Sequence, residues 1–122
     1  MNISIVRGQN KQLSKNFMSN EALCKCGKCN NNSTSSYFVN VHQGFRDYLG
    51  RAINSNSWCR CTYWNKINGG VSNSNHLTAT AGKVNCADDF RVAGLTGAQL
   101  LAKARAFGKY DYVYQIKNAK GQ

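Results

Sequence analysis

Six cysteines in a chain of only 122 residues constrain this sequence more than any other feature. They fall into a C-x-C-x2-C cluster, a C-x-C pair and a single residue: Cys24, Cys26 and Cys29; Cys59 and Cys61; and Cys86. A structural zinc ion could be held by the first cluster together with one cysteine of the pair. Disulfides between the two clusters could instead tie the N-terminal segment to the core. The third alternative is reduced, partly buried thiols that bind nothing.

The first ten residues bear on this choice. Residues 1–10 hold no apolar stretch of the kind that secretory signals carry, so we expect no cleaved signal here. That expectation weakens the disulfide alternative and favours zinc or free thiols. No apolar run approaches the roughly 20 residues that a membrane-spanning helix needs, so we expect no membrane span.

The charge is strongly positive. Sixteen Lys and Arg against five Asp and Glu give a net charge of +11. Such a charge favours an anionic partner, which could be nucleic acid, a membrane surface or an acidic polymer such as bacterial cell wall. The alternative is a solvated basic surface with no particular partner. The basic residues are spread from Arg7 to Lys120, so no arginine-rich nucleic-acid arm is visible.

The length and the apolar patterning predict one α+β domain over residues 1–122. Apolar residues at helical spacing predict a helix over 37–49 that stops at Gly50. Thr96 and Gln99 form a capping-box pattern before a second helix that ends at Gly108. A short helix is expected to begin at Ser19 or Asn20.

The rest of the chain is expected to form short strands and loops. We predict strands over 52–57, 84–90 and 110–116, and a hairpin turn over 118–121. The polar stretches 30–36 and 65–75 are predicted to be loops. The predicted architecture is a small antiparallel sheet with two main helices.

Two histidines and one acidic pair could carry chemistry. His76 lies in a polar loop, where packing alone gives little reason for an imidazole. Asp88 and Asp89 lie beside apolar residues, and such a pair needs a cation or hydrogen-bond donors. A histidine and a carboxylate begin a catalytic zinc set, which needs three protein ligands and an open water position. His42 falls within the 37–49 helix and is expected to be partly buried or at the surface.

The order of several motifs adds a resemblance. Residues 12–17 and 21–29 are followed by Phe45–Gly50, Ser57–Arg60, Asn65 with Gly69 and Gly70, Ser74–His76, and Ala87–Phe90. Over residues 12–116, this order resembles the zinc D,D-carboxypeptidases and phage endolysin-type peptidases, which have the Hedgehog/D-Ala-D-Ala peptidase fold.

The resemblance implies a site and a substrate. It makes His76 the first zinc ligand and Asp89 the second, with Asp88 as the alternative. Arg60 would face the substrate carbonyl or carboxylate and stabilise developing negative charge. Ser74 and Asn65 would contribute to substrate binding. Zinc would activate a water against peptidoglycan stem peptides, and a phage protein of this kind would act from the host cytoplasm or the virion, reaching the wall on lysis or entry.

Two departures from the family pattern leave alternatives open. Residues 77–88 hold a loop insertion of about six residues between the two proposed ligands. The family's third ligand is a histidine on a C-terminal strand, and the chain is expected to stop in the turn before it.

Two residues could substitute for the missing groups: Asp111, as general base or ligand, and Tyr114. The alternatives are an inactive wall-binding or phage structural protein, and a basic nucleic-acid-binding protein that stacks bases on Trp58 and Trp64.

Overall fold

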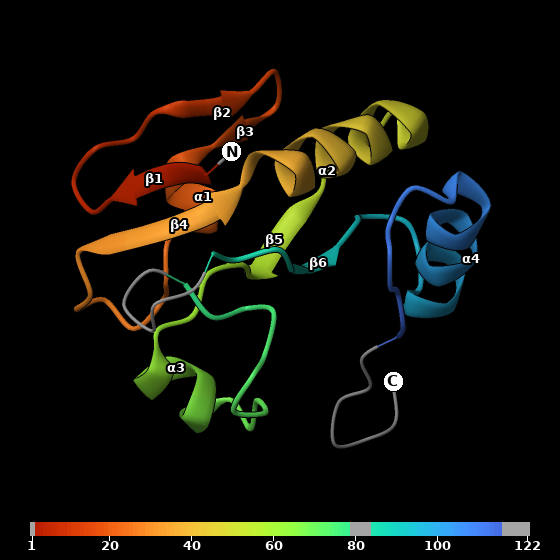
Figure 1. Cartoon of the computed structure of the whole chain (residues 1–122). Helices are drawn as coiled ribbons and strands as arrows, with labels where there is room; N and C mark the ends of the chain where they lie inside the picture. The colour runs from red at the N-terminus through yellow and green to blue at the C-terminus, as the bar shows by residue number, and fades with distance from the viewer. Residues whose placement is uncertain (1, 79–83, 116–122) are drawn as a thin grey trace.

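The computed structural model describes residues 2–78 and 84–115, which form an α+β structure of short elements (Figure 1). The order along the chain is β1 (Asn2–Val6), β2 (Gln12–Ser14), β3 (Phe17–Met18), α1 (Ser19–Ala22), β4 (Asn31–Ser35), α2 (Ser36–Leu49), β5 (Asn54–Ser57), α3 (Thr62–Ile67), β6 (Asp89–Arg91) and α4 (Gly97–Phe107). The α+β class predicted from the sequence is confirmed.

The strands form three separate antiparallel pairs among the described residues. β1 pairs with β4, β2 with β3, and β5 with β6. In the last pair, Ser55 lies opposite Phe90 and Ser57 lies opposite Asp89. This register brings the acidic pair of the sequence next to the segment that leads into Arg60.

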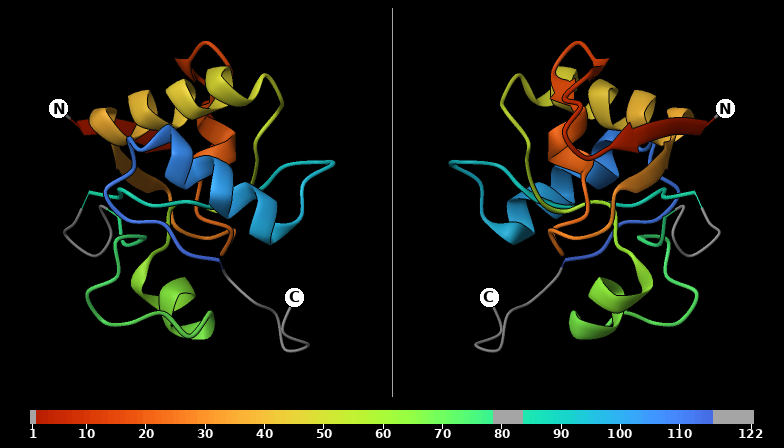
Figure 2. Two further views of the ribbon diagram at one scale, coloured as in Figure 1. Left: turned by 90° about the vertical axis from the view of Figure 1, so that its right-hand side faces the viewer. Right: turned by 90° about the vertical axis from the view of Figure 1, so that its left-hand side faces the viewer.

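Both main helices begin and end where the sequence predicts. Ser35 caps α2 by accepting a hydrogen bond from the Phe38 N–H, and Gly50 ends it with φ 65°, a left-handed conformation that glycine adopts without strain. Thr96 and Gln99 form the predicted capping box of α4. Figure 2 shows α2 and α4 side by side when the molecule is turned.

The core is aromatic and is built around α2. Its buried apolar side chains range from Ile5 in β1 to Ala104 in α4 and include Phe17, Val39, Phe45 and Trp58. The His42 ring lies within this group, stacked on Phe17 with ring centroids 4.9 Å apart. The helix that the sequence marked as amphipathic therefore buries an imidazole along with its apolar face.

The predicted loop over 30–36 is wrong, because most of it forms β4. Its polar side chains are buried and hydrogen-bonded: Asn32 Oδ1 accepts from the Cys24 N–H at 2.8 Å, and Thr34 Oγ1 accepts from the Trp58 indole N–H at 3.1 Å. Burial of a polar side chain is tolerated when such partners exist. Composition alone does not reveal these partners.

Two further strand predictions differ from the structure. The expected strand over 84–90 is reduced to β6, and the described residues 110–115 form no strand. Tyr110 instead packs its ring against Phe45, with centroids 5.4 Å apart. Residue 116 and the expected turn over 118–121 lie outside the described residues. No helix among the described residues is long and apolar enough to cross a membrane.

Candidate functional site

Two loops and one strand bring His76, Asp89 and Arg60 together. Arg60 follows β5, and its backbone N–H donates to the His76 carbonyl at 2.7 Å. Arg60 and Leu77 form an isolated parallel bridge, which fixes the His76 loop alongside the segment after β5. Asp89 enters from β6, the strand paired with β5.

The side-chain geometry of this group is tight. His76 Nε2 lies 3.2 Å from Asp89 Oδ1, and Arg60 Nη2 donates to Asp89 Oδ2 at 2.7 Å. The side chains of His76 and Asp89 are 12% and 21% exposed, so both can be reached from solvent. The Arg60 guanidinium is turned inward, where its Nε also donates to Ser57 Oγ at 2.9 Å. Arg60 therefore holds Asp89, whereas the sequence suggested that it would face a substrate.

The hydrogen bonds of His76 define its tautomer. Its Nδ1 lies 3.0 Å from the Trp58 carbonyl oxygen. Because a carbonyl oxygen only accepts, Nδ1 must carry the hydrogen. In a neutral ring, Nε2 then presents a lone pair to a carboxylate oxygen of Asp89. This arrangement is satisfied only by a second proton on the ring or by a cation shared between the two side chains.

The backbone around His76 is supported by residues that the sequence analysis did not single out for this role. Asn85 is fully buried, and its Nδ2 donates to the carbonyls of Trp58 at 2.7 Å and Ala87 at 2.9 Å. It thus ties the carbonyl that orients His76 to the segment that leads into Asp89. No sequence signal marks it, because asparagine is common throughout this chain.

Ser74 and Asn65, expected as substrate-binding residues, are both buried in the structure. Ser74 Oγ accepts from the His76 N–H at 3.1 Å, so it shapes the loop that carries His76. Asn65 Nδ2 donates to the Val71 carbonyl at 2.9 Å, which closes the loop after α3. These two hydrogen bonds join residues that are at most six positions apart in the sequence.

The neighbouring carboxylate, Asp88, points the other way. Successive residues along an extended segment face opposite sides, and Asp88 turns into the core. Its Oδ2 lies 2.9 Å from His42 Nε2, and its Oδ1 accepts from Ser55 Oγ at 2.6 Å. Burial raises the pKa of Asp88, while His42 and Ser55 oppose that rise. Asp88 is inaccessible to solvent and to His76, so Asp89 is the carboxylate of this pair that His76 meets.

His42 is more deeply buried than the sequence suggested, and its exposed area is 0%. Its second ring nitrogen, Nδ1, lies 2.5 Å from the Tyr110 hydroxyl. With Nε2–H donating to Asp88 and Nδ1 accepting from Tyr110, both ring nitrogens are satisfied within the protein. Burial, and then the charge of Asp88, raise the pKa of Tyr110.

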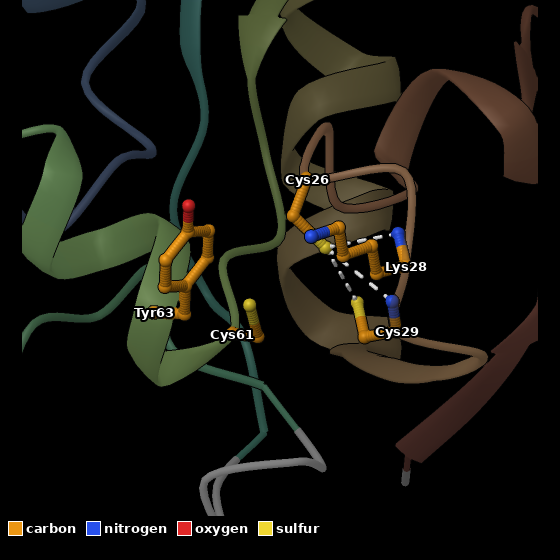
Figure 3. Close-up of a pocket in the computed structure, with 5 residues that line it drawn as sticks. All are labelled: Cys26, Lys28, Cys29, Cys61 and Tyr63. Carbon is orange, nitrogen blue, oxygen red and sulfur yellow. Dashed lines mark hydrogen bonds between the residues drawn. The ribbon is translucent and has the colours of Figure 1, made fainter.

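Four of the cysteines that the sequence offers as metal ligands lie close together. The sulfur atoms of Cys24, Cys26, Cys29 and Cys61 all lie within 4.8 Å of one another. Cys61 faces Cys26 and Cys29 from the start of α3 (Figure 3). Burial raises the pKa of Cys59 to about 12, and its thiol is directed at the Ser33 carbonyl, 3.8 Å away. The sequence left both cysteines of the C-x-C pair as candidates, and the structure brings Cys61 to the cluster.

Comparison with known protein families identifies the family of this chain. A family model described as Peptidase M15 matches residues 11–119, nearly the whole chain. The chain belongs to the peptidase M15 family. M15 enzymes are zinc peptidases, so this is a metallopeptidase-like protein. No curated protein and no solved structure matches it.

The geometry of His76 and Asp89 can be compared with the ligand spacing that a catalytic zinc ion requires. Zinc accepts imidazole nitrogen and carboxylate oxygen at about 2.0–2.2 Å, so two ligands on a tetrahedral ion are about 3.4 Å apart. The 3.2 Å between His76 Nε2 and Asp89 Oδ1 fits that spacing. The hydrogen bond from His76 Nδ1 to a backbone carbonyl is the usual support of a zinc-binding histidine.

The third protein ligand of a catalytic zinc is not found beside this pair in the described part of the chain. There, the four cysteines are the only group of three or more metal-ligating side chains. The residues at 79–83 and 116–122 include no His, Cys, Asp or Glu. Asp111 and Tyr114 are exposed, and the charge of Asp111 acts on Cys86, whose pKa is raised by burial and then by Asp111. His76 and Asp89 thus supply two donors of the three.

Proposed function

We propose that this M15 protein acts on the stem peptides of peptidoglycan through His76 and Asp89, within a single peptidase-like domain over residues 1–122. The observation that carries the proposal is the pairing of His76 Nε2 with Asp89 Oδ1 at 3.2 Å. Zinc bound there would polarise the scissile amide and lower the pKa of a bound water. The net charge of +11 favours an anionic wall polymer as substrate.

In this proposal the remaining residues position or assist. Arg60 keeps one oxygen of Asp89 occupied, so the other oxygen is presented to His76. Ser74 and the Trp58 carbonyl fix the His76 backbone and ring. Asp111, exposed and acidic, is the proposed general base. Its exposed position suits proton exchange with solvent, and a positioned base contributes about 100-fold or more to a rate.

A second function is supported by the donor count. With two protein donors the metal would be held weakly, and the same surface would then recognise wall peptides without cleaving them. We propose this catalytically inactive wall-binding role, which includes a phage structural role, as the alternative.

Incubation with purified cell-wall sacculi separates the two functions. We expect the wild-type chain, supplied with zinc, to release stem-peptide fragments, and His76→Ala and Asp89→Asn to release at least about 100-fold less. Asp47→Asn removes a carboxylate on α2, outside the site, and is the matched control. Asp111→Asn tests the base and should slow release without weakening sedimentation with the sacculi.

The outcomes are distinct. Sedimentation of the wild type with sacculi but no peptide release would replace the peptidase by the wall-binding function. Neither sedimentation nor release would reject both. Equal release by wild type and His76→Ala would reject the assignment of the site.

A further inference from the structure

We propose that Cys24, Cys26, Cys29 and Cys61 bind one structural metal ion, zinc, in a tetrathiolate site that is separate from His76 and Asp89. Three of these sulfurs come from the loop between α1 and β4, and the fourth comes from the residue before α3 (Figure 3). The site joins two segments that are more than 30 residues apart in the sequence.

The distances suit a single ion. With Zn–S bonds of about 2.3 Å, the sulfurs of a tetrahedral site are about 3.8 Å apart. The sulfurs of Cys26 and Cys29 are 3.4 Å apart, and all four lie within 4.8 Å of one another. An iron–sulfur cluster would spread the four sulfurs over several metal ions and inorganic sulfides, which this spacing does not allow.

The hydrogen bonds at these sulfurs suit thiolates. Every sulfur of the group accepts a hydrogen bond from a nitrogen at 3.4 Å. Backbone N–H groups donate to three of the sulfurs: Cys61 N–H to Cys24, Lys28 and Cys29 N–H to Cys26, and Trp64 N–H to Cys61. The side-chain amide of Asn32 donates to Cys29. A thiolate accepts such bonds, and metal-bound cysteines are thiolates. Cys59 lies two residues from Cys61, but its thiol donates to the Ser33 carbonyl, 3.8 Å away, and its sulfur is not part of the cluster.

The loop geometry and nearby charge support the same site. Gly27 has φ 77°, which lets the chain turn between Cys26 and Cys29 so that both sulfurs face one point. Arg7 Nε donates to the Cys29 carbonyl at 2.7 Å, and Arg7 Nη2 is 4.0 Å from the Cys29 sulfur. This cation offsets part of the double negative charge of a zinc ion bound by four thiolates.

Metal can reach the site from solvent. An open hollow of about 350 Å³ is lined by Cys26, Lys28, Cys29, Cys61 and Tyr63. Cys24 is buried and does not line this hollow. An accessible path and soft sulfur donors are both expected of a site that takes up zinc.

The ion would also stabilise the neighbouring functional residues. Cys61 directly follows Arg60, whose backbone and side chain contact His76 and Asp89. The Cys59 N–H also donates to the Ala22 carbonyl at 3.0 Å, a backbone link between this segment and the end of α1. Fixing Cys61 to the 24–29 loop would hold the segment 59–61, and with it Arg60, in place.

The test uses the full chain purified under reducing conditions without added metal. We expect elemental analysis to give at least one zinc per chain. Cys29→Ser and Cys61→Ser should each lose one equivalent, whereas Cys59→Ser, Cys86→Ser and His76→Ala should retain it. Cys59→Ser is the matched control for Cys61→Ser, because both remove a buried thiol from the same C-x-C pair.

A second measurement covers variants that fail to fold. Cobalt replacing zinc in the wild-type chain should produce an intense sulfur-to-cobalt charge-transfer absorption and the visible bands of a tetrahedral ion. No metal in the wild type would overturn the proposal. If the thiols of a second sample, purified without reductant, then react only after reduction, the cysteines form disulfides instead. Rapid modification of Cys24, Cys26, Cys29 and Cys61 in the folded wild type with zinc present would also overturn it, whereas the exposed Cys86 is expected to react in either case. His76→Ala leaves this site intact, so the two metal proposals can fail separately.

Discussion

Two His–Asp pairs lie next to each other in this protein, and they differ in whether the hydrogen-bonding groups of the histidine ring all have partners. His42 and Asp88 meet in the core at 2.9 Å, and both side chains are fully buried. His76 and Asp89 meet at 3.2 Å near the surface. The two carboxylates are sequence neighbours, so the difference arises from the direction in which each one points.

The partners on the far side of each ring explain the two roles. Tyr110 supplies His42 with a hydroxyl that can donate, so the core pair is complete without any added proton or metal. Trp58 supplies His76 with a carbonyl that can only accept, which leaves Nε2 and Asp89 in need of a cation. Burial with full satisfaction therefore makes one pair structural, and the accepting partner makes the other a candidate for metal binding.

The largest expected difference is in stability. Removal of one partner from a buried pair leaves an uncompensated group, and His42→Ala should lower the free energy of unfolding by about 3–5 kcal/mol. His76→Ala should lower it by about 1–2 kcal/mol, because that pair is not fully buried and Asp89 keeps its hydrogen bond to Arg60. Urea unfolding monitored by circular dichroism measures both. Similar losses for the two variants would contradict the distinction between the pairs.

The next expected effect concerns Tyr110 and pH. Tyr110→Phe leaves His42 Nδ1 without its donor and should cost about 1–3 kcal/mol at neutral pH. The raised pKa of Tyr110 in the folded chain means that unfolding releases its proton above the usual pKa of about 10. Wild-type stability therefore falls with rising pH in that range, and the variant lacks this contribution.

We accordingly expect the stability gap between wild type and Tyr110→Phe to narrow above about pH 10. Urea unfolding at neutral and alkaline pH measures this gap. Tyr112→Phe, at a tyrosine that is 78% exposed, is the control and should show little effect at either pH. A gap that stays constant or widens would be evidence against a buried Tyr110–His42 bond.

The smallest expected effect is at Ser74. Ser74→Ala removes the acceptor of the His76 N–H and should cost about 0.5–1.5 kcal/mol in stability. If Ser74 positions His76 as a metal ligand, the Ser74→Ala substitution should also weaken zinc binding at His76 and Asp89 by about tenfold. Ser72→Ala, at an exposed serine of the same loop, is the control. Metal titration alongside urea unfolding distinguishes a positioning role from a purely local one.

Much of this arrangement could be predicted from the sequence, but not all of it. The spacing of apolar residues and the capping residues located α2 and α4, because these signals are local. The ordered motifs named His76, Asp89 and Arg60, which the structure brings together. β4 and the buried roles of His42 and Asn85 were missed, because they depend on partners more than 20 residues away.

The sequence by itself determined the charge, the two helices, the cysteine spacing and the set of residues able to bind metal. Only the tertiary structure decided between Asp88 and Asp89, and between Cys59 and Cys61. In each case the two side chains are chemically equal, and the choice depends on which way the backbone turns each one and on whether the atoms it meets donate or accept a hydrogen bond.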